Sequence, residues 1–147
     1  MAQNTWFECK IQYEKTMEDG TQKKVTEPYL VDALSFTEAE ARIMEETEPF
    51  VSGEYTVSDI RKTSYSELFD STKSEDDRWF KAKLMFVTVD EKSGKEKKKA
   101  SAVMVKGKNL GKALANLSES MKKSMADYEV AAIQETAIMD VFAYRKK

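Results

Sequence analysis

The chain has 147 residues, of which 41% are hydrophobic and 34% are charged, and its formal net charge is −2 at pH 7. This length and composition predict one folded domain or two very small ones, and exclude a chain that is disordered throughout. The sequence contains no histidine, which excludes Ser-His-Asp and Cys-His catalysis, HExxH-type zinc sites and ordinary histidine acid/base chemistry.

The N-terminal sequence "MAQNTWFECK" lacks the basic and apolar regions of a signal peptide. No apolar run approaches the roughly 20 residues of a membrane helix. The single cysteine, Cys9, excludes an internal disulfide and fits a reducing compartment. We therefore expect a cytoplasmic protein with no membrane association. Cys9 lies between Phe7 and Ile11 at strand spacing, which predicts a core residue rather than a reactive thiol.

The first half of the sequence predicts strand, turn, strand, helix and strand. Around Cys9, apolar and polar residues alternate as in a half-buried strand. "EDGTQ" at 18–22 predicts a hairpin turn, and "VTEPYLVDA" at 25–33 the return strand. A helix follows over "SFTEAEARIMEE", where Thr37 and Glu40 have capping-box spacing. The segment "EYTVSDIRKTSYSELF", residues 54–69, predicts the closing strand.

The second half predicts the same order of elements. "WFKAKLMFVTVD" and "ASAVMVKG" are predicted as strands joined by the turn "EKSGK", and a helix is expected from about Asn109. "YEVAAIQETAIMDVFAY", residues 128–144, predicts the closing strand. The helix carries one apolar stripe that predicts packing on a sheet. Its members are Leu110, Ala113, Leu114, Leu117 and Met121.

Ordered matches between the two halves indicate an internal duplication. Trp6 and Trp79 differ by 73 positions, Gly20 and Gly94 by 74, and Tyr55 and Tyr128 again by 73. The one-residue shifts fall in turns or at helix ends, where insertions cost least. We predict an α+β fold of two tandem β-β-α-β units related by a pseudo-twofold axis. Each unit has a mainly antiparallel sheet and one helix.

The repeats set the expected domain boundaries. Residues 1–70 form the first unit, 71–78 a polar linker and 79–147 the second unit, with the two units sharing one core because each is small alone. Residues 1–74 contain 8 Lys/Arg and 15 Asp/Glu, a net charge of −7, whereas residues 75–147 contain 16 and 11, a net charge of +5. This asymmetry indicates either a polyanion site or attraction between the halves or between subunits, through otherwise solvated charge.

Candidate binding residues lie on the sheet face that the helices are not expected to cover. This face carries Trp6 in the first repeat, and it carries a basic group of residues in the second. The second group is Trp79, Lys81 and Lys83, with Lys97, Lys98 and Lys99 as an electrostatic arm in the hairpin. Stacking of bases on an indole requires an exposed side chain, whereas an interface tryptophan is covered. The exposure of the two tryptophans therefore separates two functions.

The phrases "WFECKIQYEK", "KKVTEPYLVDALSFTEAEARI" and "YEVAAIQETAIMDVF" resemble an uncharacterised domain family of gut anaerobic bacteria and their phages. The resemblance covers nearly the whole chain. It implies no reaction and no catalytic residues, because the function of the family is unknown. Its phage association favours nucleic-acid or replication-related roles by association only.

Three functions are compared on this basis. The favoured one is a non-catalytic protein-interaction or scaffolding module, including self-association as a homodimer, and the alternative is a single-stranded nucleic-acid-binding protein using the basic second unit. An enzyme is disfavoured, because the acidic residues of the first helix are explained by a solvated helix face. These residues are Glu38, Glu40, Glu45, Glu46 and Glu48. We assign no catalytic, metal or cofactor residue.

Overall fold

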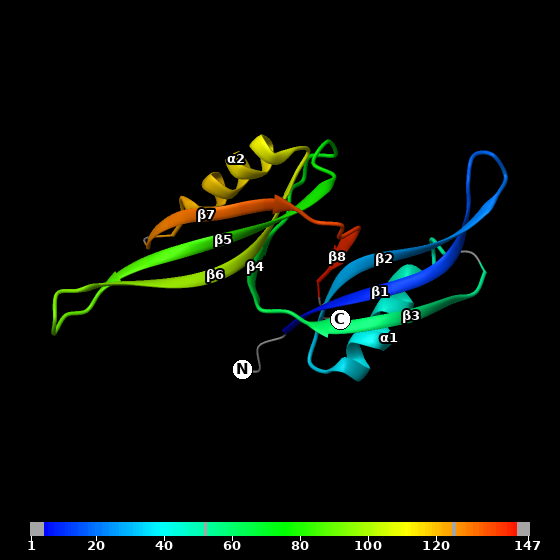
Figure 1. The fold of residues 1–147 in the computed structure, drawn as a ribbon, viewed down its shortest axis with the longest axis horizontal. Helices are drawn as coiled ribbons and strands as arrows, with labels where there is room; N and C mark the ends of the chain where they lie inside the picture. The colour runs from blue at the N-terminus through cyan, green and yellow to red at the C-terminus, as the bar shows by residue number, and fades with distance from the viewer. Residues whose placement is uncertain (1–4, 52, 125, 144–147) are drawn as a thin grey trace. The chain divides into compact units, whose positions relative to one another are not determined.

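The computed structural model describes residues 5–51, 53–124 and 126–143. These residues form two helices and eight strands, which confirms the predicted α+β class (Figure 1). The chain divides into two compact units: unit 1 holds residues up to Ser64 and from Ala137 onward, and unit 2 is Tyr65–Thr136. In chain order the elements are β1 (Thr5–Thr16), β2 (Gln22–Ala33), α1 (Phe36–Thr47), β3 (Tyr55–Lys62), β4 (Tyr65–Phe69), β5 (Arg78–Val89), β6 (Glu96–Gly107), α2 (Leu110–Met121), β7 (Asp127–Glu135) and β8 (Asp140–Phe142).

Each unit contains one four-stranded sheet, and the two sheets have the same order. Unit 1 has the order β3-β1-β2-β8 and unit 2, read from its far edge, β7-β5-β6-β4. The β1–β2, β1–β3, β5–β6 and β5–β7 pairs are antiparallel, whereas β2–β8 and β4–β6 are parallel. The two mainly antiparallel sheets agree with the predicted architecture.

The same backbone hydrogen bonds occur in both units. Thr63 donates from its backbone N–H (2.9 Å) and its hydroxyl (2.7 Å) to the carbonyl of Trp6. Thr136 does the same to the carbonyl of Trp79, at 3.0 Å and 2.9 Å. A bulge interrupts the β1–β3 pairing between Lys10 and Ile11, and the β5–β7 pairing at the matching place on β5. Bulges and irregular contacts that recur in register support duplication more strongly than strand order alone.

Each segment that the sequence predicted as one closing strand contains two strands. In the first repeat, β3 ends at Lys62 and β4 begins at Tyr65. The second strand of each pair joins the sheet of the other repeat: β4 pairs with β6 in unit 2, and β8 pairs with β2 in unit 1 (Figure 1). The compact units therefore do not coincide with the sequence repeats, since the repeats exchange their last strands.

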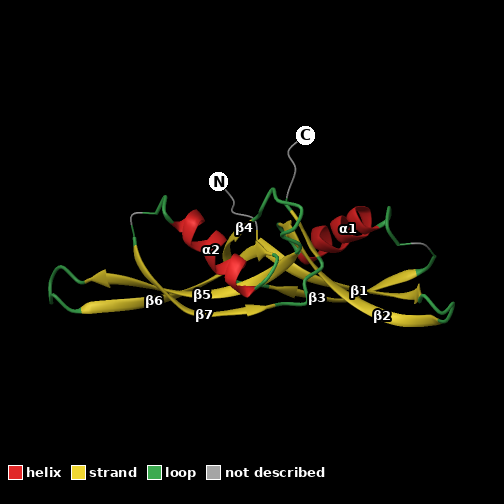
Figure 2. Cartoon of the chain, turned by 90° about the horizontal axis from the view of Figure 1, so that it is seen from above, coloured by secondary structure: helices red, strands yellow, loops and turns green. Residues whose placement is uncertain are grey.

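Each helix covers one face of its own sheet (Figure 2). The N-cap of α1 is Ser35, whose hydroxyl accepts a hydrogen bond from the N–H of Glu38 at 3.1 Å. The prediction that Thr37 is the N-cap was therefore wrong. Ser35 and Glu38 have the same Ser/Thr-x-x-Glu spacing as Thr37 and Glu40, and the sequence alone did not separate the two pairs. The predicted start of α2 is confirmed, because the side chain of Asn109 accepts from the N–H of Lys112 at 2.8 Å.

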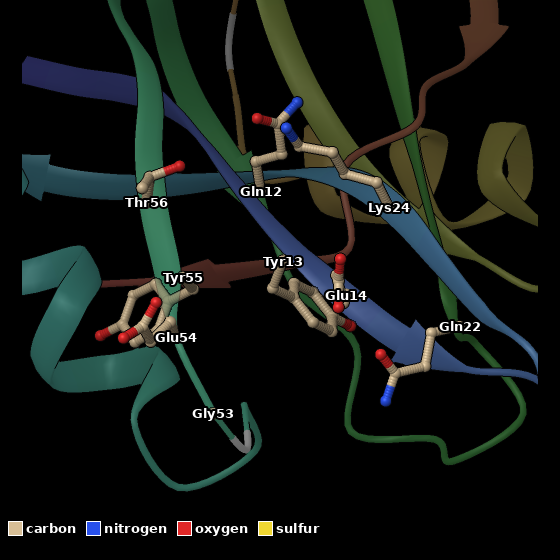
Figure 3. A pocket seen from close by; sticks show the side chains of 9 residues that line it. All are labelled: Gln12, Tyr13, Glu14, Gln22, Lys24, Gly53, Glu54, Tyr55 and Thr56. Carbon is tan, nitrogen blue, oxygen red and sulfur yellow. The ribbon is translucent and has the colours of Figure 1, made fainter.

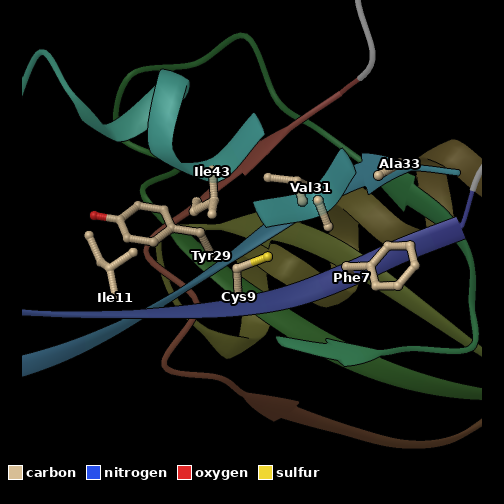
Figure 4. Close-up of a cluster of buried hydrophobic side chains, with 8 residues drawn as sticks. Phe7, Cys9, Ile11, Tyr29, Val31, Ala33 and Ile43 are labelled. Atoms are coloured by element: carbon tan, nitrogen blue, oxygen red, sulfur yellow. The ribbon is translucent and has the colours of Figure 1, made fainter. Parts of the chain in front are cut away.

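A buried cluster lies between helix and sheet in each unit. In unit 1 it contains Phe7, Cys9, Ile11, Tyr29, Val31, Ala33, Ala39 and Ile43 (Figure 4). In unit 2 it contains Phe80, Ala82, Leu84, Val103, Val105, Ala113, Leu117 and Met121. The core position of Cys9 is confirmed, and burial raises the pKa of its thiol to about 12.

The apolar stripe predicted on α2 is wider than the face that the sheet covers. Ala113, Leu117 and Met121 are buried, but Leu110 is 50% exposed and Leu114 is 40% exposed. The three buried residues are spaced four apart and form one line, whereas Leu110 and Leu114 lie on the flank of that line. The prediction that these two residues belong to the core was therefore wrong.

Candidate functional site

The face of unit 2 opposite α2 carries both β5 lysines that the sequence singled out. Along β5, Lys81 and Lys83 are exposed, whereas the alternating residues Phe80, Ala82 and Leu84 are buried in the cluster under α2. Successive side chains of a strand point to opposite faces, so Lys81 and Lys83 share the face away from the helix. Their partners on β6 are Met104 and Ala102. The result is a basic sheet surface with small or apolar neighbours.

Trp79 lies at the start of the same face but is buried. Its side chain is only 1% exposed, and the ammonium of Lys106 lies 5.6 Å from the centre of its ring. Its indole N–H has no hydrogen-bond partner among the described residues. Trp6, the matching residue of unit 1, is half-buried. A base needs an open ring face to stack, so Trp79 does not offer a stacking platform in this arrangement.

The three lysines of the β6 hairpin do not share one face. Lys98 lies opposite Val87 and so belongs to the face of Lys81 and Lys83, whereas Lys97 and Lys99 point to the helix side. Lys98 is 3.6 Å from a carboxylate oxygen of Glu129, and Lys97 is 3.8 Å from one of Asp90. The predicted electrostatic arm is therefore divided between the two faces of an exposed strand.

Tyr65 is a residue of this surface that the sequence analysis missed. It begins β4, pairs with Ala102 and is half-buried. The ammonium of Lys81 lies 5.9 Å from the centre of its ring. The signal that could have found it is the polar pair Thr63-Ser64, which separates β3 from β4. With one long closing strand assumed, Tyr65 could not be placed beside Lys81.

A buried carboxylate holds the segment that was predicted to be a polar linker. Asp76 is 2% exposed and accepts hydrogen bonds from the hydroxyl of Ser71, from the backbone N–H of Lys108 at 3.1 Å and from the side-chain amide of Asn116 at 3.1 Å. The bond from Ser71 is the main cause that lowers the pKa of Asp76, against the opposing effect of burial. Because its oxygens are used by neighbouring elements of unit 2, Asp76 has a structural role.

Unit 1 contains a hollow of about 520 Å³ where β3 begins (Figure 3). Two tyrosines stand in its wall, and their hydroxyls are already bonded: Tyr13 donates to Glu27 at 2.8 Å and Tyr55 to the carbonyl of Met44 at 3.0 Å. Burial, then the bond to Glu27, raises the pKa of Tyr13 to about 12, so this phenol is not an acid/base group near neutral pH. The lining is Gln12, Tyr13, Glu14, Gln22, Lys24, Gly53, Glu54, Tyr55 and Thr56.

Neither described helix is long and apolar enough to cross a membrane. Within residues 5–51, 53–124 and 126–143, no three Cys, Asp or Glu side chains gather as a metal site would require. No curated protein and no solved structure matches the chain. A family model described as a domain of unknown function (DUF4494) matches residues 5–144, which is nearly the whole sequence. The chain therefore belongs to the DUF4494 family of domains of unknown function.

Proposed function

We propose that this chain is a non-catalytic binding module whose partners are proteins. One observation carries the proposal: each sheet accepts a short added strand on an edge that otherwise stays open. Within the described parts of the chain, β8 pairs only with Tyr29–Val31 of β2, and β4 pairs only with Ala102–Val105 of β6. Each of these acceptor strands has twelve residues. Much of each edge therefore keeps unpaired backbone groups that another extended segment can pair with.

The burial of Trp79 argues against the alternative function, because a base cannot stack on a covered indole. Trp79 is buried by this chain alone, so the protein-binding proposal rests on the sheet edges and not on this side chain. Self-association remains part of the proposal, because an added strand can come from a second copy. The cytoplasmic location and the association with gut anaerobes and their phages also remain proposals.

A random-peptide library selected against the full-length chain tests this function. We expect enriched peptides of extended character that bind in fluorescence anisotropy, or a dimer that forms with increasing concentration in light scattering. Chains that stay monomeric and enrich no peptide would contradict the proposal. The unfolded chain, presented in the same selection, is the control for nonspecific adsorption.

A second candidate function rests on Tyr65 rather than on Trp79. Its ring lies beside Lys81 on the open face that also carries Lys83, so a base on Tyr65 would have lysines near its phosphates. Under this hypothesis, Tyr65→Ala weakens binding of a labelled single-stranded oligonucleotide by about 1–3 kcal/mol. The affinity also falls steeply with added salt. Anisotropy titrations at two salt concentrations measure both effects, and an absence of binding at low salt rejects this candidate.

A further inference from the structure

We propose that the free edge of β6, residues 96–100, binds an extended acidic segment of a partner protein by strand addition. This inference rests on the proposed protein-binding function and names the place and the chemistry of the partner. Among the described residues, no strand pairs with this part of β6 on the side away from β5. The protein already uses the same edge in this way, since β4 lies along its continuation at Ala102–Val105.

The backbone of this edge points outward at alternate residues. The N–H of Asp90 donates to the carbonyl of Lys95 at 2.9 Å, which fixes this pair as hydrogen-bonded at the end of the hairpin. Bonded and non-bonded pairs alternate along an antiparallel ladder, so Lys98 and Ala100 direct their N–H and C=O groups away from β5. The carbonyl of Ala102 accepts from the hydroxyl of Ser66 in β4 at 3.3 Å, which agrees with this direction. Donors and acceptors are thus available for a ladder.

Lysines on both faces of the edge determine which segment it accepts. Lys98 lies on one face, and Lys97 and Lys99 lie on the other. Edge lysines oppose pairing with neutral or basic strands, because the added strand would bury or crowd positive charge. An alternating acidic strand places carboxylates beside the lysines on both faces.

The present partners of these lysines are easily exchanged. Lys97, Lys98 and Glu129 are more than half exposed, and Asp90 is 32% exposed, so both ion pairs are in contact with solvent and contribute little to stability. No carboxylate of the described residues lies within ion-pair distance of Lys99. A partner's carboxylates can therefore replace the existing pairs at small cost and add a new one.

The matching edge of unit 1 keeps lysines at two of the three positions, Lys23 for Lys97 and Lys24 for Lys98, but differs at two others. Pro28 occupies the position that Ala102 has in unit 2, and its carbonyl accepts from the N–H of Met139 at 2.9 Å, so the same side of the strand has no N–H to donate there. Val25 stands where unit 2 has Lys99. Thr26 corresponds to Ala100, which makes the two positions a matched pair for substitution.

The test uses the full-length chain and a labelled eight-residue peptide of alternating Val and Glu in fluorescence anisotropy. Three unlabelled competitors separate the contributions: the Val-Lys peptide, an acidic peptide with proline at alternate positions, and a mixed-sequence single-stranded oligonucleotide. We expect that only the Val-Glu peptide competes. Equal competition by the proline peptide or by the oligonucleotide would show charge attraction without strand addition, and would overturn the inference.

Variants locate the site. Ala100→Pro removes an outward N–H without touching the β5 ladder, and we expect it to abolish binding, whereas Thr26→Pro in unit 1 leaves binding unchanged. Replacing Lys97, Lys98 and Lys99 with Gln weakens binding about tenfold or more. Circular dichroism and thermal unfolding report whether each variant folds. Equal binding by Ala100→Pro and the unsubstituted chain would overturn the inference.

Amide hydrogen exchange of the unsubstituted chain supplies a measurement that needs no variant. Adding the peptide should slow exchange at Lys98 and Ala100, and exchange unchanged at both would overturn the proposed site. The random-peptide selection keeps this failure distinct from failure of the proposed function. Enriched peptides that are indifferent to Ala100→Pro would retain protein binding and reject this edge, whereas no enriched peptide and no self-association would reject both.

Discussion

In each unit, a side chain from the middle of the helix helps to hold the segment that follows the exchanged strand, β8 in unit 1 and β4 in unit 2. The two units use different residues at this matching helix position. In unit 1, Arg42 donates to the carbonyl of Asp32, and to the carbonyls of Phe142 at 3.4 Å and Ala143 at 3.1 Å. In unit 2 the matching residue is Asn116, which donates to the carbonyl of Lys106 at 2.8 Å and to Asp76.

The carbonyls of Asp32 and Lys106 are themselves at matching positions, 74 residues apart. After the duplication, both helices have therefore kept a side chain that holds the segment after the exchanged strand, although this side chain is an arginine in one unit and an asparagine in the other. A long guanidinium reaches backbone carbonyls directly, whereas a short amide needs a buried carboxylate to reach the chain that follows β4. Both units therefore have specific side-chain hydrogen bonds that stabilise the strand exchange.

The largest effect is expected from truncating the two cores at matching positions. Ile43→Ala and Leu117→Ala remove fully buried side chains, and each should lower the free energy of unfolding by about 2–5 kcal/mol. Because each sheet contains a strand from the other repeat, both variants should shift one common transition in chemical denaturation. Two separate transitions, of which each variant shifts only one, would contradict this coupling.

The spacing between helix and sheet differs between the two units at one pair of matching positions, Ala33 and Gly107. A Cβ added at Gly107 would lie 2.6 Å from the backbone nitrogen of Ala113 and 2.7 Å from its Cα, so α2 must move. Gly107→Ala should therefore destabilise the protein by about 1–3 kcal/mol. Unit 1 carries Ala33 at the matching position, and Ala33→Gly should cost about 1–2 kcal/mol through loss of a buried methyl group and added chain entropy. Urea denaturation compares the two, and a stabilising Gly107→Ala would show that the helices pack alike.

The Asp76 network predicts a difference in acid sensitivity. Asp76→Asn should lower the free energy of unfolding at neutral pH by about 1–3 kcal/mol, because it removes an acceptor from buried donors. The pKa of Asp76 is lowered below its ordinary value of 3.8. Its ionised form therefore stabilises the fold above that value, and this contribution is lost as the pH falls through the lowered pKa.

Urea denaturation at several pH values should accordingly show the difference between Asp76→Asn and the unsubstituted chain shrinking as the solution becomes acidic. Asp77→Asn is the control, since Asp77 is exposed and its substitution should change stability little. A difference that stays constant down to acidic pH would contradict the role of the ionised carboxylate.

The smallest effects concern the helix caps. Ser35→Ala and Asn109→Ala should each cost about 1 kcal/mol, because both side chains accept a hydrogen bond from the first turn. Thr37→Ala lies inside the first turn of α1 and should cost less. Thermal unfolding of the three variants measures the ranking, and a larger loss for Thr37→Ala would reverse the assignment of the cap.

The sequence predicted those parts of the fold that local patterns determine. Alternation around Cys9 and around Leu84 located the long strands, and the turns at Gly20 and Gly94 were correctly placed, each glycine having a positive φ. The two repeats could be aligned because matched residues occur in order. These features depend on neighbours along the chain, so sequence pattern is sufficient for them.

Features that depend on distant partners could not be predicted in the same way. Nothing around Tyr65 states that β4 pairs with β6, since a parallel partner is chosen by the whole fold. Alternation placed Trp79 on the face opposite the helix, but it does not say whether that face is covered there. The free edge of β6 can be recognised only once the strand order is known. From the sequence alone, Lys97, Lys98 and Lys99 were therefore interpreted as one electrostatic arm and not as residues on opposite faces of an edge strand.

The exchange of β4 and β8 also sets an order of completion during synthesis. Unit 2 is one continuous segment, Tyr65–Thr136, and all its strands exist once that segment has been made. The sheet of unit 1 is complete only after β8 has been made, because Asp140–Phe142 of β8 pairs with Tyr29–Val31, which are synthesised much earlier. The edge of β2 therefore lacks β8 throughout the synthesis of unit 2, and a sheet edge without its partner strand is open to aggregation during that time.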